Sequence, residues 1–155
     1  MLVRSMTIND LEEIVNIEKD LYKTPWNERQ YKYELEENEF SYVFILEHND
    51  IIVGYYGFWI MFDKIDITKV SIRKEFQGMK LSNILMEDCF NRVKALGCKK
   101  INLEVRTTNE RAINLYKKHG FEDVIISKNY YGKNEDALIL SKILEEWLRW
   151  IKVKY

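Results

Sequence analysis

A change of hydrophobic period in one short segment constrains the fold of this chain more than any other feature. Apolar and polar residues alternate over residues 101–106, as in a β-strand with one buried face. After Asn109 the apolar residues take helical spacing instead. The segment predicts a strand, a turn and a helix, with Glu104 near the end of the strand and Tyr116 in the second or third turn of the helix.

The ends of this helix have their own signals. Thr107 with Glu110 three residues later is a capping-box pattern, which predicts the helix start. Gly120 comes after two lysines and a histidine, which is typical of a helix end. A carboxylate, an amide and a phenol therefore surround one strand-to-helix turn, and these groups can move protons.

Other patterns place further elements along the chain. They predict a helix capped at Thr7 or Asn9 that ends before Pro25, a short helix from Asn27, strands near 42–47, 51–61 and 65–72, a helix at 82–96, and strands near 122–128 and 136–142. This order predicts an α+β fold with a central mixed sheet flanked by helices.

Composition limits the class of protein. A length of 155 residues fits one domain, with 46% hydrophobic residues for a core. The 24 basic and 25 acidic side chains balance, which argues against nucleic acid as a direct ligand. Two cysteines, no metal-type cluster, no signal peptide and no membrane-length apolar run predict a cytoplasmic protein without a metal.

Three motifs, in chain order, resemble those of a known family. They are the run Pro25-Trp26-Asn27-Glu28, the segment 103–121, and Asn129-Tyr130-Tyr131 followed by Glu135-Asp136-Ala137. Together they resemble the GNAT N-acetyltransferases, and among them the ribosomal-protein-alanine N-acetyltransferases and related protein N-terminal acetyltransferases. The resemblance covers residues 1–142 and implies the GNAT fold with acetyl-CoA as the acetyl donor.

Acetyl transfer to an amine needs a base and an acid. Glu104 is the candidate base, acting through water, and the resemblance implies that Tyr116 protonates the leaving thiolate. The resemblance also implies a hydrogen bond from Asn109 to the cofactor. The alternatives are a surface ion pair of Glu104 with Arg106 or a lysine, a core aromatic at Tyr116, and a helix cap at Asn109.

The resemblance implies two backbone sites for the donor. The strand segment Val70, Ser71 and Ile72 would polarise the thioester carbonyl. A loop that opens a helix would hold the pyrophosphate with Gly78, Met79, Lys80, Leu81, Ser82 and Asn83. Lys80 and Ser82 stand where the family pattern has glycine and glycine or alanine, so cofactor affinity is the property most at risk. The Lys80 ammonium is able to meet a phosphate directly.

An aromatic wall is the candidate site for the acceptor. Trp26, Tyr31, Tyr130 and Tyr131 would surround a peptide N-terminus, with Glu135 orienting polar groups. Ordinary core or rim packing is the alternative interpretation of these aromatics. Residues 143–155 carry apolar side chains at helical spacing and predict an amphipathic helix that packs on the same domain or at a dimer interface.

These features favour transfer of acetyl from acetyl-CoA to the N-terminal α-amine of a protein, with a ribosomal protein (N-terminal alanine) as the leading acceptor and a monomer or homodimer as the active species. Two alternatives stay open. One is acetylation of a lysine or a small amine. The other is a non-catalytic GNAT-like binding module whose altered loop no longer holds acetyl-CoA.

Overall fold

The computed structural model describes residues 1–144, so the helix predicted over residues 143–155 lies almost wholly outside it. The chain forms two compact units. Unit 1 comprises residues 1–60 and 68–92, and unit 2 comprises residues 61–67 and 93–155. Strand β4 (Lys64–Ile72) contributes its first residues to unit 2 and the remainder to unit 1.

Unit 1 contains an antiparallel meander with helices on both faces. Its elements are β1 (Leu2–Ser5), the short helix η1 (Ile8–Asp10), α1 (Leu11–Leu21), α2 (Glu28–Lys32), the π-helix η2 (Tyr33–Glu37), β2 (Ser41–His48), β3 (Ile51–Met61), the end of β4, η3 (Lys74–Phe76) and most of α3 (Leu81–Ala95). The strand order is β1-β2-β3-β4.

Alternation along β3 explains how both faces of this meander are covered. The Tyr55 hydroxyl bonds Glu18 of α1, whereas the hydroxyl of its neighbour Tyr56 bonds Asp88 of α3. Successive side chains of a strand point to opposite faces, so α1 and α3 pack on opposite sides of the sheet. A Cβ at Gly54 would come within 2.8 Å of a backbone oxygen of β4, so this close packing needs glycine.

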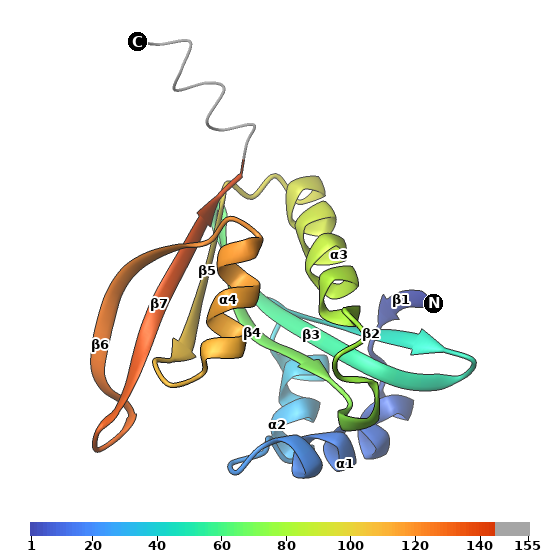
Figure 1. Ribbon diagram of the computed structural model, residues 1–155. Coiled ribbons are helices and arrows are strands. Elements are labelled where there is room, and N and C mark those ends of the chain that lie inside the picture. Colours follow the sequence, from blue (N-terminus) through green and yellow to red (C-terminus); the bar gives the residue numbers. More distant parts are fainter. Residues whose placement is uncertain (145–155) are drawn as a thin grey trace. The chain divides into compact units, whose positions relative to one another are not determined.

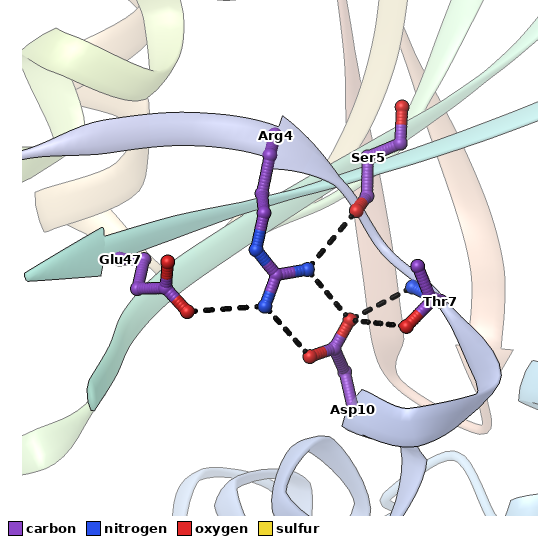
Figure 2. A network of polar contacts seen from close by, with 5 residues as sticks. All are labelled: Arg4, Ser5, Thr7, Asp10 and Glu47. Atoms are coloured by element: carbon purple, nitrogen blue, oxygen red, sulfur yellow. Dashed lines mark hydrogen bonds and ion pairs between the residues drawn. The ribbon is translucent and has the colours of Figure 1, made fainter. Parts of the chain in front are cut away.

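The first strand, β1, is an element that the sequence patterns did not predict. It pairs antiparallel with β2, and Arg4 on β1 ties the strand to the first helical segment (Figure 2). The Arg4 guanidinium donates to both carboxylate oxygens of Asp10 at 2.9 Å and to Glu47 of β2 at 3.1 Å. Asp10 also accepts the backbone N–H and the hydroxyl of Thr7, so one buried carboxylate organises the start of that segment.

Unit 2 has a mixed sheet. Its elements are the start of β4, the end of α3, β5 (Lys100–Arg106), α4 (Glu110–Lys118), β6 (Glu122–Gly132) and β7 (Glu135–Ile143), with strand order β4-β5-β7-β6. The β4–β5 pair is parallel, and β7 pairs antiparallel with both β5 and β6. Strands β6 and β7 form a long hairpin (Figure 1). The predicted mixed sheet with flanking helices is confirmed.

Two local expectations about helix caps had different outcomes. The short helix does begin at Asn27, whose side chain and that of Gln30 bond each other's backbone N–H groups. The prediction of a Thr107–Glu110 capping box was wrong. Helix α4 is capped by Asn109, whose Oδ1 accepts the N–H of Ala112 at 3.2 Å. Asparagine serves as well as threonine at this position, so the cap lies two residues later than expected.

Candidate active site

Glu104 lies on β5 directly after the last residue paired with β4. The paired residues are Lys64–Ile67 with Lys100–Leu103, and on its other side Glu104 pairs with Ile139 of β7. Its carboxyl is half-buried, and this burial, together with the negative charge of Asp66, raises its pKa above the usual value. A carboxyl with a raised pKa is a better general base than an ordinary surface glutamate.

The tip of the β6–β7 hairpin presents two aromatic rings. Tyr130 and Tyr131 meet edge to face with ring centroids 4.9 Å apart, and both are exposed. Partial burial of each hydroxyl raises its pKa, and the Glu104 carboxylate adds to this effect on both. Two aromatic side chains therefore lie within electrostatic range of the candidate base.

Polar contacts hold this tip in shape. Asn129 adopts a left-handed φ of 56°, and its side chain accepts the N–H of Asn134 at 2.8 Å. The Asp136 carboxylate accepts the N–H of Asn129 at 2.9 Å and an ammonium hydrogen bond from Lys128 at 3.1 Å, and these bonds lower its pKa. The Asn and Asp of the C-terminal motif thus set the turn that carries the tyrosines.

Arg106 connects the tip to β5. Its guanidinium lies 4.2 Å from the centroid of the Tyr131 ring and 3.2 Å from Glu135. The alternative that pairs Arg106 with Glu104 finds no support, because the ion pair of Arg106 is with Glu135. Arg106 therefore contacts both Glu135 and Tyr131, and the sequence indicated neither contact.

Tyr116 and Asn109 both have a structural role. The Tyr116 ring is 8% exposed and packs edge to face against Phe121 at 5.7 Å. Asn109 is the N-terminal cap of α4. The core and capping roles are confirmed, and the roles toward the thiolate and the cofactor stay predictions.

The loop before α3 keeps a glycine-like shape although lysine replaces glycine. Gly78 has φ +80° and Lys80 has φ +59°, a left-handed conformation that a lysine rarely adopts. Helix α3 begins at the next residue, Leu81. The Lys80 side chain is exposed at the start of this helix, where a cation can meet an anion.

The segment Val70–Ser71–Ile72 belongs to the unit 1 part of β4. Ser71 is buried, and its hydroxyl makes a hydrogen bond with the Tyr22 hydroxyl. The side chain of Ser71 is therefore used inside the fold. The role of this segment's backbone toward the donor, which the resemblance implies, stays a prediction.

Tyr31 is a core residue and not part of an acceptor wall. Its side chain is 1% exposed, and its hydroxyl donates to Glu18 at 2.6 Å. The half-buried Trp26 packs on it at 5.4 Å and also covers the Lys69 ammonium at 4.4 Å. Trp26 is therefore partly exposed, and its inner side packs on the buried Tyr31 ring.

A buried ion pair explains this arrangement. Glu18 is fully buried, yet it accepts hydrogen bonds from Lys69 at 2.6 Å and from the hydroxyls of Tyr31 and Tyr55. Neither Glu18 nor Lys69 was predicted from the sequence. A glutamate on the inward stripe of α1 was the available signal, since glutamate is almost never fully buried without a partner.

Residues 1–144 contain neither a membrane-spanning helix nor a metal cluster. No helix there is long and apolar enough to cross a bilayer. In the same part of the chain, no three His, Cys, Asp or Glu side chains gather in a way that could hold a metal ion.

Comparisons with known proteins decide the family. Residues 11–121 match the model of the acetyltransferase (GNAT) family. The chain belongs to this family. One relative is a Bacillus subtilis protein that is named provisionally as a ribosomal protein bS18-alanine N-acetyltransferase. The two sequences are 34% identical over 93% of this chain and 96% of the relative.

An Escherichia coli GNAT relative has both a matching sequence and a matching structure. The chain is 26% identical to the E. coli ribosomal protein bS18-alanine N-acetyltransferase, over 90% of this chain and 95% of the relative. The crystal structure of the E. coli ribosomal-protein-S18-alanine N-acetyltransferase superposes with a TM-score of 0.83 at 25% identity, covering 92% of each chain. The expected fold is confirmed, and the protein is an acetyl-CoA-dependent N-acetyltransferase.

Proposed function

We propose that this GNAT enzyme acetylates the N-terminal α-amine of a ribosomal protein that begins with alanine, in the cytoplasm. The half-buried Glu104 beside Asp66 is the observation that carries the proposal, since it supplies a base of raised pKa. An α-amine has a pKa of about 7.7 to 8.0, against about 10.4 for lysine. A carboxylate base therefore deprotonates an N-terminus far more easily than a lysine side chain.

The chemistry depends on two residues of unit 2. Glu104 accepts a proton from the α-ammonium, directly or through water, and leaves a neutral amine. The amine nitrogen then bonds to the thioester carbonyl carbon, and the C–S bond of the donor breaks. Tyr116 gives its hydroxyl proton to the departing thiolate. The acetylated nitrogen loses its extra proton, which returns to the Tyr116 phenolate through water, and Glu104 releases its proton to solvent, so charge and protons balance.

Other residues bind and orient. The amides at the start of α3, with the Lys80 ammonium, meet the pyrophosphate of acetyl-CoA, and Asn109 donates a further hydrogen bond to the donor. The backbone of Val70–Ile72 polarises the acetyl carbonyl. Tyr131 and Glu135 contact the acceptor peptide from the β6–β7 tip, and a contact of the acceptor with Trp26 stays a prediction.

A matched pair of peptides tests the acceptor. One has a free N-terminal alanine and no lysine, and the other has the same sequence with a blocked N-terminus and one internal lysine. We expect acetylation of the first peptide to be at least about tenfold faster in kcat/KM, measured by mass spectrometry and thiol release. Equal rates, or a preference for the lysine peptide, would contradict the proposal.

A further inference from the structure

A short connector between α1 and α2 carries the Pro25-Trp26 pair. It spans residues 22–27, from Tyr22, the C-terminal cap of α1, to Asn27, the N-terminal cap of α2. Tyr22 is 36% exposed and Trp26 is half-buried, so both rings reach the surface of unit 1. A connector with so much exposed surface keeps one shape only where side chains tie it to the fold.

One ammonium group ties both rings to β4. The Lys69 Nζ lies 4.7 Å from the centroid of the Tyr22 ring and 4.4 Å from the centroid of the Trp26 ring. These are cation–π distances, and the attraction is stronger for a cation that is withdrawn from water. The Lys69 side chain is only 13% exposed, so it meets this condition.

Glu18 holds the ammonium in this place. One of its carboxylate oxygens accepts a hydrogen bond from Lys69 at 2.6 Å, and the other accepts the backbone N–H of Trp26 at 3.1 Å. Moving Lys69 away would leave a fully buried carboxylate without its cation, which is strongly unfavourable. The connector is therefore held by its backbone as well as by its rings.

The same strand supplies a second tie. Ser71 lies two residues after Lys69 on β4, so the two side chains share one face of the strand. The Ser71 hydroxyl bonds the Tyr22 hydroxyl. Both ties lie within unit 1. The strand segment that the resemblance implies for the donor thus also holds the connector that carries Trp26.

We propose that Lys69 is a positioning residue for acetyl transfer. Held by Glu18, its ammonium fixes the Tyr22 and Trp26 rings as a preformed wall for the acceptor peptide. This inference rests on the proposed function, in which a contact of the acceptor with Trp26 is predicted. A wall that is already ordered costs less entropy to bind, so Lys69 acts on the KM of the acceptor and not on the affinity for acetyl-CoA.

Steady-state kinetics with the alanine peptide test this role. The double variant Glu18→Gln with Lys69→Met removes the ammonium without leaving a buried charge, and its glutamine can still accept the Trp26 N–H. We expect the peptide KM to rise about tenfold, while kcat changes less than about threefold and the Kd of acetyl-CoA less than about twofold. Lys69→Arg keeps a cation that stacks on aromatic rings, so its peptide KM should stay close to that of the unaltered protein.

Two further variants make the test specific. Trp26→Leu removes one ring from a half-buried position, and its peptide KM should rise about as much as in the double variant. The matched control is Glu13→Gln with Arg73→Met. That ion pair, at 3.0 Å, also links α1 to the residue after β4, but Glu13 lies more than two helical turns before the connector. The control should leave the peptide KM unchanged.

Several results would overturn the role of Lys69. They are an unchanged peptide KM in the double variant or in Trp26→Leu, an equal rise in the control, and a rise in Lys69→Arg as large as in the double variant. If the unaltered protein still prefers the alanine peptide, such a result refutes only the role of Lys69. Equal rates of the unaltered protein on the two matched peptides would instead contradict the proposed function, and this inference with it.

Discussion

Asp66 and Glu104 lie on the same face of the parallel β4–β5 pair, and their carboxylates repel each other. Asp66 pairs with Asn102, two residues before Glu104, so the side chains of all three point to one side of the sheet. Burial is the larger cause of the raised pKa of Glu104, and the charge of Asp66 adds to it. The Glu104 carboxyl therefore binds a proton more readily than an ordinary glutamate.

Replacing Asp66 by asparagine should move the pH dependence of catalysis. Without the Asp66 charge the Glu104 carboxylate is less disfavoured, so its pKa falls and the acid limb of kcat/KM shifts to lower pH. A pH–rate profile measures this shift. Asp63→Asn removes an equal charge from the exposed β3–β4 turn and should leave the limb in place. An unmoved limb in Asp66→Asn would show that another group governs it.

Glu104→Gln should separate activity from stability. Loss of the base should lower kcat/KM about 10²- to 10⁴-fold. A raised folded pKa means that Glu104 opposes folding once pH rises through it, so the glutamine variant should melt at an equal or higher temperature near pH 7. Near pH 4 the carboxyl is largely protonated in both states, and the difference should vanish. Calorimetry at both pH values checks this, with the exposed Glu122→Gln as control.

Lys80 should contribute to donor affinity through its charge. Asparagine tolerates the left-handed backbone of this position, so Lys80→Asn keeps the loop while removing the ammonium. Loss of one charge-assisted contact to a phosphate should weaken acetyl-CoA binding about tenfold and reduce its salt dependence. Titration calorimetry at two salt concentrations measures both, and Lys74→Asn, in the η3 turn, is the control. Tighter binding by the asparagine variant would mean that Lys80 only obstructs the loop.

The sequence predicted which elements carry Glu104 and Tyr116, because the local hydrophobic period decides that placement. Alternation put Glu104 outward on β5, and the change to helical spacing put Tyr116 on α4, both as found. Asp66 was not predicted as a neighbour because its position depends on the register between two strands distant in sequence. Strand β1 was missed for a related reason, since four residues without clear alternation become a strand only by pairing with β2.

Aromatic residues show a second limit of sequence reasoning. Tyr31 and Tyr131 were both predicted to belong to an acceptor wall, with more support for Tyr131, but Tyr31 is in the core and Tyr131 is exposed at 37%. The difference comes from the buried carboxylate of Glu18, which gives the Tyr31 hydroxyl a partner inside the fold. A tyrosine can be buried when its hydroxyl is bonded, and no local pattern reveals that partner.

Breaking the Glu18–Lys69 pair from one side should destabilise unit 1 strongly. Lys69→Met leaves a fully buried carboxylate without its cation, which typically costs about 3 to 5 kcal/mol. The double variant Glu18→Gln with Lys69→Met removes both charges and should regain a large part of that loss. Urea unfolding of the single and double variants measures the difference. A double variant no more stable than Lys69→Met would show that the lysine contributes packing and not charge.

The N-terminal strand should depend on Arg4 in a way that pH reveals. Arg4→Met keeps much of the apolar stem but removes the paired hydrogen bonds to the buried Asp10, so we expect a loss of about 1.5 to 3 kcal/mol near neutral pH. The Arg4 hydrogen bonds lower the folded pKa of Asp10 below its usual 3.8, so this stabilisation is complete above pH 3.8 and is lost as pH falls through the folded pKa. Unfolding of the two proteins should therefore converge in acid. The control is Arg29→Met, at an exposed position of α2, which should lose little free energy of unfolding at either pH. An equal loss in Arg29→Met would mean that general charge, and not the Asp10 contact, is responsible.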